Sequence, residues 1–191
     1  MKNIALLGCG GMGKGHANAI ASGSGNPIWA GVPGIPEGKL HETDSDVGKV
    51  LTLSGVYDVD PACCDWARER GYHVYESYDA ILADPQVDIV LIATPNHLHK
   101  EQAIAAMRAG KHVLCEKPVM IDGDEMAEVM AVSQETGKIF YPRQNRRWDK
   151  DYLTMKKVYD EKLIGNVFHI ESRYHGSRGI PGDWRGIKEK G

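Results

Sequence analysis

Apolar runs and polar stretches alternate along the first 142 residues, and this alternation predicts strands and helices in turn. The run over residues 88–94 is continuous and apolar, which is typical of a parallel strand buried on both faces. Shorter runs predict further strands at residues 4–7, 50–57, 72–75, 112–118 and 138–141. The pattern between them predicts helices from Met12 onward and over residues 61–71, 77–84, 99–110 and 122–137. We therefore expect an α/β fold with a doubly wound parallel sheet of the Rossmann type, in the strand order 3-2-1-4-5-6.

Residues 22–48 interrupt this alternation. They are rich in Gly, Pro and Ser, and their apolar positions have a period of neither 2 nor 3.6. The segment is predicted to be a long loop between the first helix and the second strand.

The pattern changes after residue 142. Residues 149–162 predict a helix, and residues 166–175 alternate polar and apolar side chains, which predicts a long, half-buried strand. One strand cannot form a domain, so it must pair within a longer protein or with another chain. We expect residues 1–142 to form the Rossmann domain, and residues 143–191 to form the incomplete start of an α+β domain with a mostly antiparallel sheet.

Composition narrows the classes of protein further. The net charge of −3 is too balanced for a general nucleic-acid binder, and no apolar run approaches the about 20 residues of a membrane span. Because Met1 and Lys2 lead directly into the first predicted strand, we expect no signal peptide. The four cysteines form no Cys-x-x-Cys pair, as in a reduced, cytoplasmic protein.

Gly8, Gly10 and Gly13 form a G-x-G-x-x-G motif between the first strand and the first helix. This is the context that a dinucleotide-binding fingerprint requires. Gly8 permits a tight turn, and Gly10 lets backbone N–H groups approach a pyrophosphate. Gly13 lets the helix lie close to the strand. Gly11 and Met12 open the helix, whose N-terminus favours phosphate.

An acidic residue at the end of the second strand is expected to bind the adenosine ribose. Asp58 directly follows the run over residues 50–57 and is our candidate. The number of residues between Gly13 and Asp58 is larger than usual by about the length of the loop. Glu37 and Asp44 are nearer in sequence but end no strand. An acid here favours NAD over NADP, and the alternative is a turn or capping residue before Pro61.

Two further segments are expected at the carboxyl edge of the sheet, where open parallel sheets bind ligands. The loop from Ala93 to His99 is positioned to touch a cofactor through Thr94 and backbone groups. Glu116 and Lys117 follow the fifth strand, and Lys117 could exchange a proton with a substrate hydroxyl while hydride moves. The alternative for Lys117 is an exposed lysine at a strand end.

Two other patterns point to different chemistry. His97 and His99 have the spacing of a metal pair, but no nearby Cys or acidic residue completes a ligand set, so we expect no metal. Arg143, Arg146 and Arg147 follow the last strand, where a substrate pocket or a solvated turn is favoured over nucleic acid.

Together these motifs resemble the Gfo/Idh/MocA oxidoreductases, the family of glucose-fructose oxidoreductase and inositol 2-dehydrogenase, over nearly the whole chain. The matching segments are G-C-G-G-M-G, D-V-D-P, A-T-P-N-H-L-H, G-K-H-V-L-C-E-K-P, R-Q-N-R-R-W-D and L-I-G-N-V-F-H-I-E. The resemblance implies hydride transfer between NAD or NADP and a sugar, inositol or related polyol. It also implies a C-terminal sheet that often forms homo-oligomers.

The resemblance assigns roles by position. Lys117 is implied as the catalytic lysine, and Asn145 and Arg146 are implied to approach the substrate. The implied cofactor contacts are Gly8, Gly10, Gly11, Met12, Gly13, Asp58, Thr94, Pro95, Asn96, His99, Glu116, Lys117, Trp184 and Arg185.

The chain departs from the family pattern in two ways. The loop over residues 22–48 is unusually long, and the family's D-x-x-x-H catalytic segment lies further along than Gly191. We therefore expect NAD binding to survive and turnover to be weak or absent. Two alternatives stay open: an NAD-dependent glycosidase of the same fold with no net redox change, and a non-catalytic NAD-binding module.

Overall fold

The computed structural model describes residues 1–23, 47–173 and 175, and its centre is a parallel sheet of five strands. The strands are β1 (Lys2–Leu7), β2 (Leu51–Tyr57), β3 (Ile89–Ile92), β4 (His112–Cys115) and β5 (Phe140–Pro142). They lie in the order β2-β1-β3-β4-β5, and every neighbouring pair is parallel. The crossover from β2 across β1 to β3 creates the switch in strand order at which such sheets bind ligands.

The third strand expected from the sequence is reduced to one bridge. Val74 pairs with Val56 in parallel, through N–H of Val56 to the carbonyl of His73 and N–H of Tyr75 to the carbonyl of Val56, both 2.9 Å. The bridge places this segment beside β2, on the side away from β1. The expected order 3-2-1-4-5-6 is therefore confirmed. The segment begins directly after the left-handed turn at Gly71.

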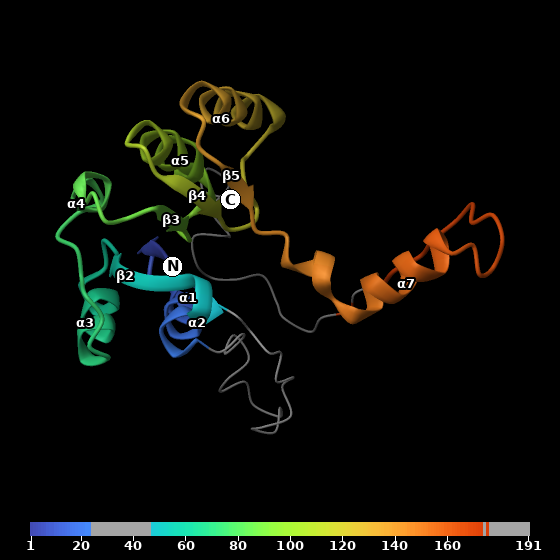
Figure 1. The fold of residues 1–191 in the computed structure, drawn as a ribbon, viewed down its shortest axis with the longest axis horizontal. Coiled ribbons are helices and arrows are strands. Elements are labelled where there is room, and N and C mark those ends of the chain that lie inside the picture. The colour runs from blue at the N-terminus through green and yellow to red at the C-terminus, as the bar shows by residue number, and fades with distance from the viewer. Residues whose placement is uncertain (24–46, 174, 176–191) are drawn as a thin grey trace.

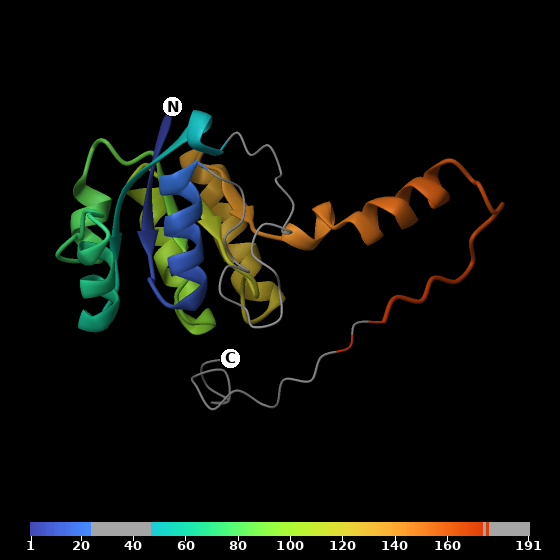
Figure 2. The same ribbon diagram turned by 90° about the horizontal axis from the view of Figure 1, so that it is seen from below.

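Helices cover both faces of the sheet (Figures 1 and 2). One face carries α1 (Gly11–Ser22) and α3 (Pro61–Glu69), and the other carries α4 (Tyr78–Ala83), α5 (His99–Arg108) and α6 (Gly123–Thr136). Alternation along β1 explains the two layers, because Ile4 and Leu6 pack on the first face while Ala5 and Leu7 pack on the second. The doubly wound fold is therefore confirmed.

Local signals set the helix ends. The side chains of Asp60, Ser77 and Asp122 accept hydrogen bonds from the first turns of α3, α4 and α6. Gly137 ends α6 in the left-handed conformation. A short helix, α2 (Val47–Val50), precedes β2, and a 3-10 turn, η1 (Asn96–Leu98), precedes α5.

The segment after β5 projects away from the sheet (Figure 1). It contains the 3-10 turn η2 (Asn145–Trp148) and α7 (Lys150–Asp160), which confirms the helix expected there. The strand predicted over residues 166–175 is wrong for the residues described, because 166–173 and 175 contain no strand. A strand needs a partner, and none of the described residues pairs with this segment. Phe168 is consequently 100% exposed and Ile170 59% exposed.

Two expectations concern residues outside the described ranges. Most of the predicted loop over residues 22–48 lies there, and so do Glu37 and Asp44. Within the described ranges, every helix is too short or too polar to cross a bilayer.

Candidate functional site

The glycine-rich turn between β1 and α1 has the geometry that its sequence predicts. Gly8 adopts φ +93°, and a Cβ on it would lie 2.7 Å from the carbonyl carbon of Ala93. A Cβ on Gly13 would lie 2.0 Å from the carbonyl oxygen of Gly8, so α1 can approach the turn only with glycine there. By contrast, a Cβ on Gly10 or Gly11 would meet nothing within 4 Å, which leaves open space at the start of the helix.

The N-terminus of α1 faces this space with no side-chain cap of its own. Gly10 is its N-cap residue, so no side chain accepts from the first N–H groups, and the first turn contains no acidic residue. Unpaired N–H groups and the positive end of the helix dipole favour a phosphate at such a position. The turn therefore fits a dinucleotide pyrophosphate.

Asp58 lies beside the turn, directly after β2. Its Oδ2 accepts a hydrogen bond from the N–H of Cys9 at 2.5 Å, and its Oδ1 accepts from the N–H of Asp60 at 2.8 Å. These bonds fix the carboxylate next to the glycine turn despite the long separation in sequence. Each oxygen keeps a second lone pair, so the carboxylate fits a pair of ribose hydroxyls.

The loop after β3 is held by its own polar side chains. The hydroxyl of Thr94 donates to Oε1 of Gln102 on α5 at 2.6 Å. His99 is 1% exposed, and its Nε2 lies 2.9 Å from the carbonyl oxygen of Thr94. Its Nδ1 lies 3.0 Å from the carbonyl oxygen of Pro118, in the loop that follows β4. The ring of His99 thus joins the two loops that flank the expected nicotinamide position.

The E-K-P segment after β4 has a buried acid and an exposed lysine. Glu116 is 4% exposed, and its Oε1 accepts from Nε2 of His16 at 2.6 Å and from Nη1 of Arg143 at 2.9 Å. Its Oε2 accepts from the N–H of Lys117 at 3.1 Å. Burial raises the pKa of Glu116, but His16, Arg143 and the Lys117 N–H outweigh it, so the pKa lies below its ordinary value.

Lys117 lies at the carboxyl edge, followed by a cis peptide bond to Pro118. Its side chain is exposed, and none of the described residues forms a hydrogen bond or ion pair with its Nζ. The amine is therefore open to a ligand placed at this edge.

The remaining predicted residues divide into two groups. Asn96 is 7% exposed in η1, and Pro95 directly precedes it, so both stay in the loop beside the glycine turn. Asn145 and Arg146 are exposed in η2, where Arg146 pairs with Asp149 at 2.7 Å. Trp184 and Arg185 lie outside the described residues.

Sequence reasoning missed two residues of this site and misplaced a third. His16 and Gln102 were not predicted, and Arg143 was considered only as part of a basic run. His16 follows Gly13 by three residues, which places it on the same sheet-facing side of α1. That spacing is the signal that could have found it.

The two histidines of the H-x-H pair have different surroundings. Both ring nitrogens of His99 face carbonyl oxygens, while Nδ1 of His97 is buried without a hydrogen-bond partner among the described residues. No group of three or more His, Cys, Asp or Glu side chains that could hold a metal occurs in the part of the chain that the structure describes. All four cysteines are free thiols.

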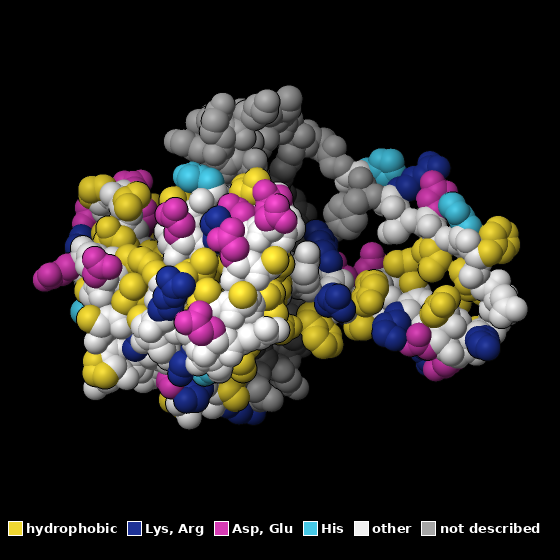
Figure 3. Space-filling view, turned by 90° about the horizontal axis from the view of Figure 1, so that it is seen from above, with side chains coloured by type: hydrophobic (Ala, Val, Ile, Leu, Met, Phe, Trp, Pro, Cys, Tyr) yellow, Lys and Arg dark blue, Asp and Glu magenta, His cyan; other side chains and the backbone are white. Residues whose placement is uncertain are grey.

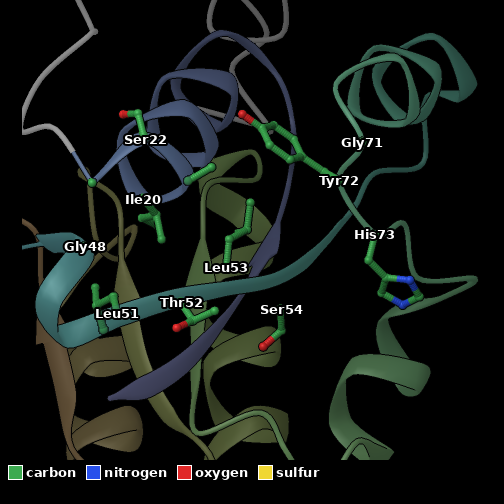
Figure 4. Close-up of a pocket in the computed structure, with 12 residues that line it drawn as sticks. Ile20, Ser22, Gly48, Leu51, Thr52, Leu53, Ser54, Gly71, Tyr72 and His73 are labelled. Atoms are coloured by element: carbon green, nitrogen blue, oxygen red, sulfur yellow. The ribbon is translucent and has the colours of Figure 1, made fainter.

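A cavity of about 600 Å³ lies away from this site (Figure 4). It lies between the end of α1 and the first half of β2, and its lining includes Ile20, Leu51, Leu53 and Tyr72. These β2 residues belong to the amino end of the strand, whereas ligands of open parallel sheets bind beyond the carboxyl ends. The cavity is therefore separate from the candidate cofactor site.

Comparison with known proteins gives concordant matches. The oxidoreductase family with an NAD-binding Rossmann fold, Gfo/Idh/MocA, matches residues 2–144. The crystal structure of an NAD-binding protein from Listeria innocua superimposes with a TM-score of 0.81 at 41% identity, over 99% of this chain and 49% of that one.

Two relatives of named activity also match. Levoglucosan dehydrogenase of Pseudarthrobacter phenanthrenivorans is 32% identical over 176 residues, which are 90% of this chain and 40% of the relative. The scyllo-inositol 2-dehydrogenase (NADP(+)) IolW of Bacillus subtilis is 33% identical over 113 residues, 59% of this chain and 32% of the relative. The chain spans less than half the length of each of these three proteins.

Proposed function

Since this chain belongs to the Gfo/Idh/MocA family of oxidoreductases, we propose that it binds NAD(H) and takes part in hydride transfer to or from a sugar, inositol or related polyol. The observation that carries the proposal is the glycine turn. Gly13 has no room for a side chain, Gly10 faces open space, and Asp58 is hydrogen-bonded to the turn itself. The names of two relatives, one acting on levoglucosan and one on scyllo-inositol, support the substrate class.

Different described residues would bind different parts of the cofactor. The N–H groups of Gly10, Gly11 and Met12 would hold the pyrophosphate, and Asp58 would accept from the adenosine ribose hydroxyls. A carboxylate at that position repels a 2′-phosphate, so we propose NAD rather than NADP as the preferred cofactor. The loop from Thr94 to Asn96 and the E-K-P segment would flank the nicotinamide.

Lys117 would transfer the proton. When bound, the nicotinamide supplies the hydride acceptor or donor. As a substrate alcohol is oxidised, Nζ of Lys117 would take the proton of its hydroxyl, and in the reverse direction it would return that proton to the carbonyl oxygen. Its exposure and its lack of a partner among the described residues support this role.

We propose that residues 143–191 begin a second domain, which completes the substrate site and forms a homo-oligomer. Exposed apolar side chains along this projecting segment support the proposal (Figure 3). Trp148, Leu163, Ile164 and Phe168 are 71%, 60%, 73% and 100% exposed. A surface of this kind is typical of an interface.

The experiment that tests the function has two steps. NADH and NADPH are titrated against the protein by fluorescence, and tighter binding of NADH supports the proposal. Sugars, anhydrosugars and inositols are then screened with NAD, and formation of NADH is followed by absorbance. Glycoside cleavage without added NAD would favour the glycosidase alternative, and NADH binding without any turnover would favour a binding module. Absence of binding to either cofactor would refute the proposal.

A further inference from the structure

One buried carboxylate connects three elements at the carboxyl edge of the sheet. Glu116 follows β4, and its two oxygens accept from His16 on α1, from Arg143 after β5 and from the backbone N–H of Lys117, at 2.6, 2.9 and 3.1 Å. The side chain thus contacts the helix of the glycine turn and the backbone of the proposed proton-transfer residue at the same time.

These contacts leave Glu116 poorly placed to bind a cofactor itself. It is 4% exposed, and both of its oxygens already accept from protein donors. A buried carboxylate is stable only while its partners stay in place. The positions of His16, which is 7% exposed, and of Lys117 are consequently linked through it.

We propose that Glu116 is a positioning residue, which sets Lys117 relative to the cofactor held by α1. The sequence motif alone suggested a cofactor contact, whereas the geometry assigns it to the protein interior. His16 acts through Glu116, because it donates a hydrogen bond to Oε1 and so fixes the carboxylate. The position of Oε2 in turn fixes the backbone N–H of Lys117, which donates to it. This inference rests on the proposed function only where it refers to the bound cofactor.

Substitution of Glu116 by Gln separates this role from simple packing. Gln has the same shape but only one acceptor oxygen, and we expect that oxygen to face His16 and Arg143, because two donors lie on that side. The NH₂ group of Gln then faces the N–H of Lys117. The Lys117 N–H thereby loses its acceptor, so hydrogen exchange at the Lys117 amide should accelerate about tenfold or more in the cofactor-free protein.

His16 supplies the matched pair of variants. His16→Ala removes the donor and should accelerate exchange at Lys117 as Glu116→Gln does. His16→Gln restores a donor and should bring exchange to within about threefold of the unmodified protein, since the bond is re-formed. Asp88→Asn is the control, because it breaks the Lys2–Asp88 pair at the opposite edge of the sheet.

A second readout uses the cofactor. With NADH at saturation, acetylation of Lys117 is measured by mass spectrometry. We expect NADH to protect Lys117 in the unmodified protein and in Asp88→Asn, and to protect it poorly in Glu116→Gln although NADH still binds.

The outcomes are distinct. Unchanged exchange at the Lys117 amide in Glu116→Gln would overturn the positioning role. Failure of His16→Gln to rescue what His16→Ala loses would also overturn it, because general loss of packing would then explain the result. If the unmodified protein binds no NADH, the proposed function fails, and the exchange measurement in the cofactor-free protein still decides the role of Glu116.

Discussion

The carbonyl oxygen of Gly8 lies 2.0 Å from the point that a Cβ on Gly13 would occupy. No side chain can be accommodated there unless α1 moves away from the turn. Gly13→Ala should therefore lower the free energy of unfolding by about 1–3 kcal/mol, as overpacking does, and it should weaken NADH binding strongly. Denaturant unfolding and fluorescence titration measure the two effects.

Gly10→Ala is the matched variant, because a Cβ on Gly10 meets nothing within 4 Å. Its stability should stay within about 0.5 kcal/mol of the unmodified protein, as for other open positions. NADH binding should still weaken, since the methyl group enters the space proposed for the pyrophosphate. Equal affinity in both proteins would place the phosphates elsewhere.

Asp58 should determine the choice of cofactor. Asp58→Ala removes the repulsion of a 2′-phosphate and the acceptor for two ribose hydroxyls, so the ratio of the NADPH and NADH dissociation constants should fall about tenfold or more. Asp58→Asn keeps an acceptor for the N–H of Cys9 but loses the charge, and it should show most of the same change. If the unmodified protein binds NADPH as tightly as NADH, Asp58 does not have this role.

Lys117 should be required for chemistry rather than for binding. In an active form of the protein, Lys117→Met keeps the aliphatic stem and should lower kcat by about two to four orders of magnitude, the scale of general acid–base catalysis. The dissociation constant for NADH should change far less, because the glycine turn holds the phosphates. Lys156→Met, on α7, serves as the control. A near-normal kcat for Lys117→Met would eliminate the role.

The cysteines should differ in reactivity. Burial is the largest cause that raises the pKa of Cys9 and of Cys115 to about 12, and both side chains are fully buried. Cys63 is only partly buried, although burial and Asp58 raise its pKa as well. A thiol reagent at pH 8 should modify Cys63 first and reach Cys9 and Cys115 only on unfolding. Prompt modification of Cys115 in the native protein would contradict the packing of β4.

Acid should destabilise the fold partly through Glu116. Its folded-state pKa is depressed, so its contribution is present above the unfolded value of about 4.5 and is lost as the pH falls through the folded value. Glu116→Gln should cost about 1.5–3 kcal/mol at pH 7, and the difference from the unmodified protein should shrink below about pH 4.5. Urea unfolding at pH 7 and pH 3.5 measures it, and a constant difference would be the contrary result.

The sequence predicted the strand order and the glycine turn because each depends on local pattern. Continuous apolar runs identify buried parallel strands, and the spacing of Gly8, Gly10 and Gly13 reflects contacts within one turn. The bonds of Glu116 were not predictable in this way, since His16 is 100 residues distant in sequence. Alternation over residues 166–175 predicted a half-buried strand, but a strand forms only with a partner, and pairing is not encoded in the segment itself.

The ring of His99 has a mechanical consequence for the site. Its Nε2 and Nδ1 lie 2.9 and 3.0 Å from the carbonyl oxygens of Thr94 and Pro118, and it is also the first residue of α5. We therefore expect the two loops on this side of the site to open as a single cooperative unit, because unwinding the first turn of α5 would release both loops together. Exchange at amides near these two loops should consequently share one opening free energy, although the loops are separated by a whole helix and strand.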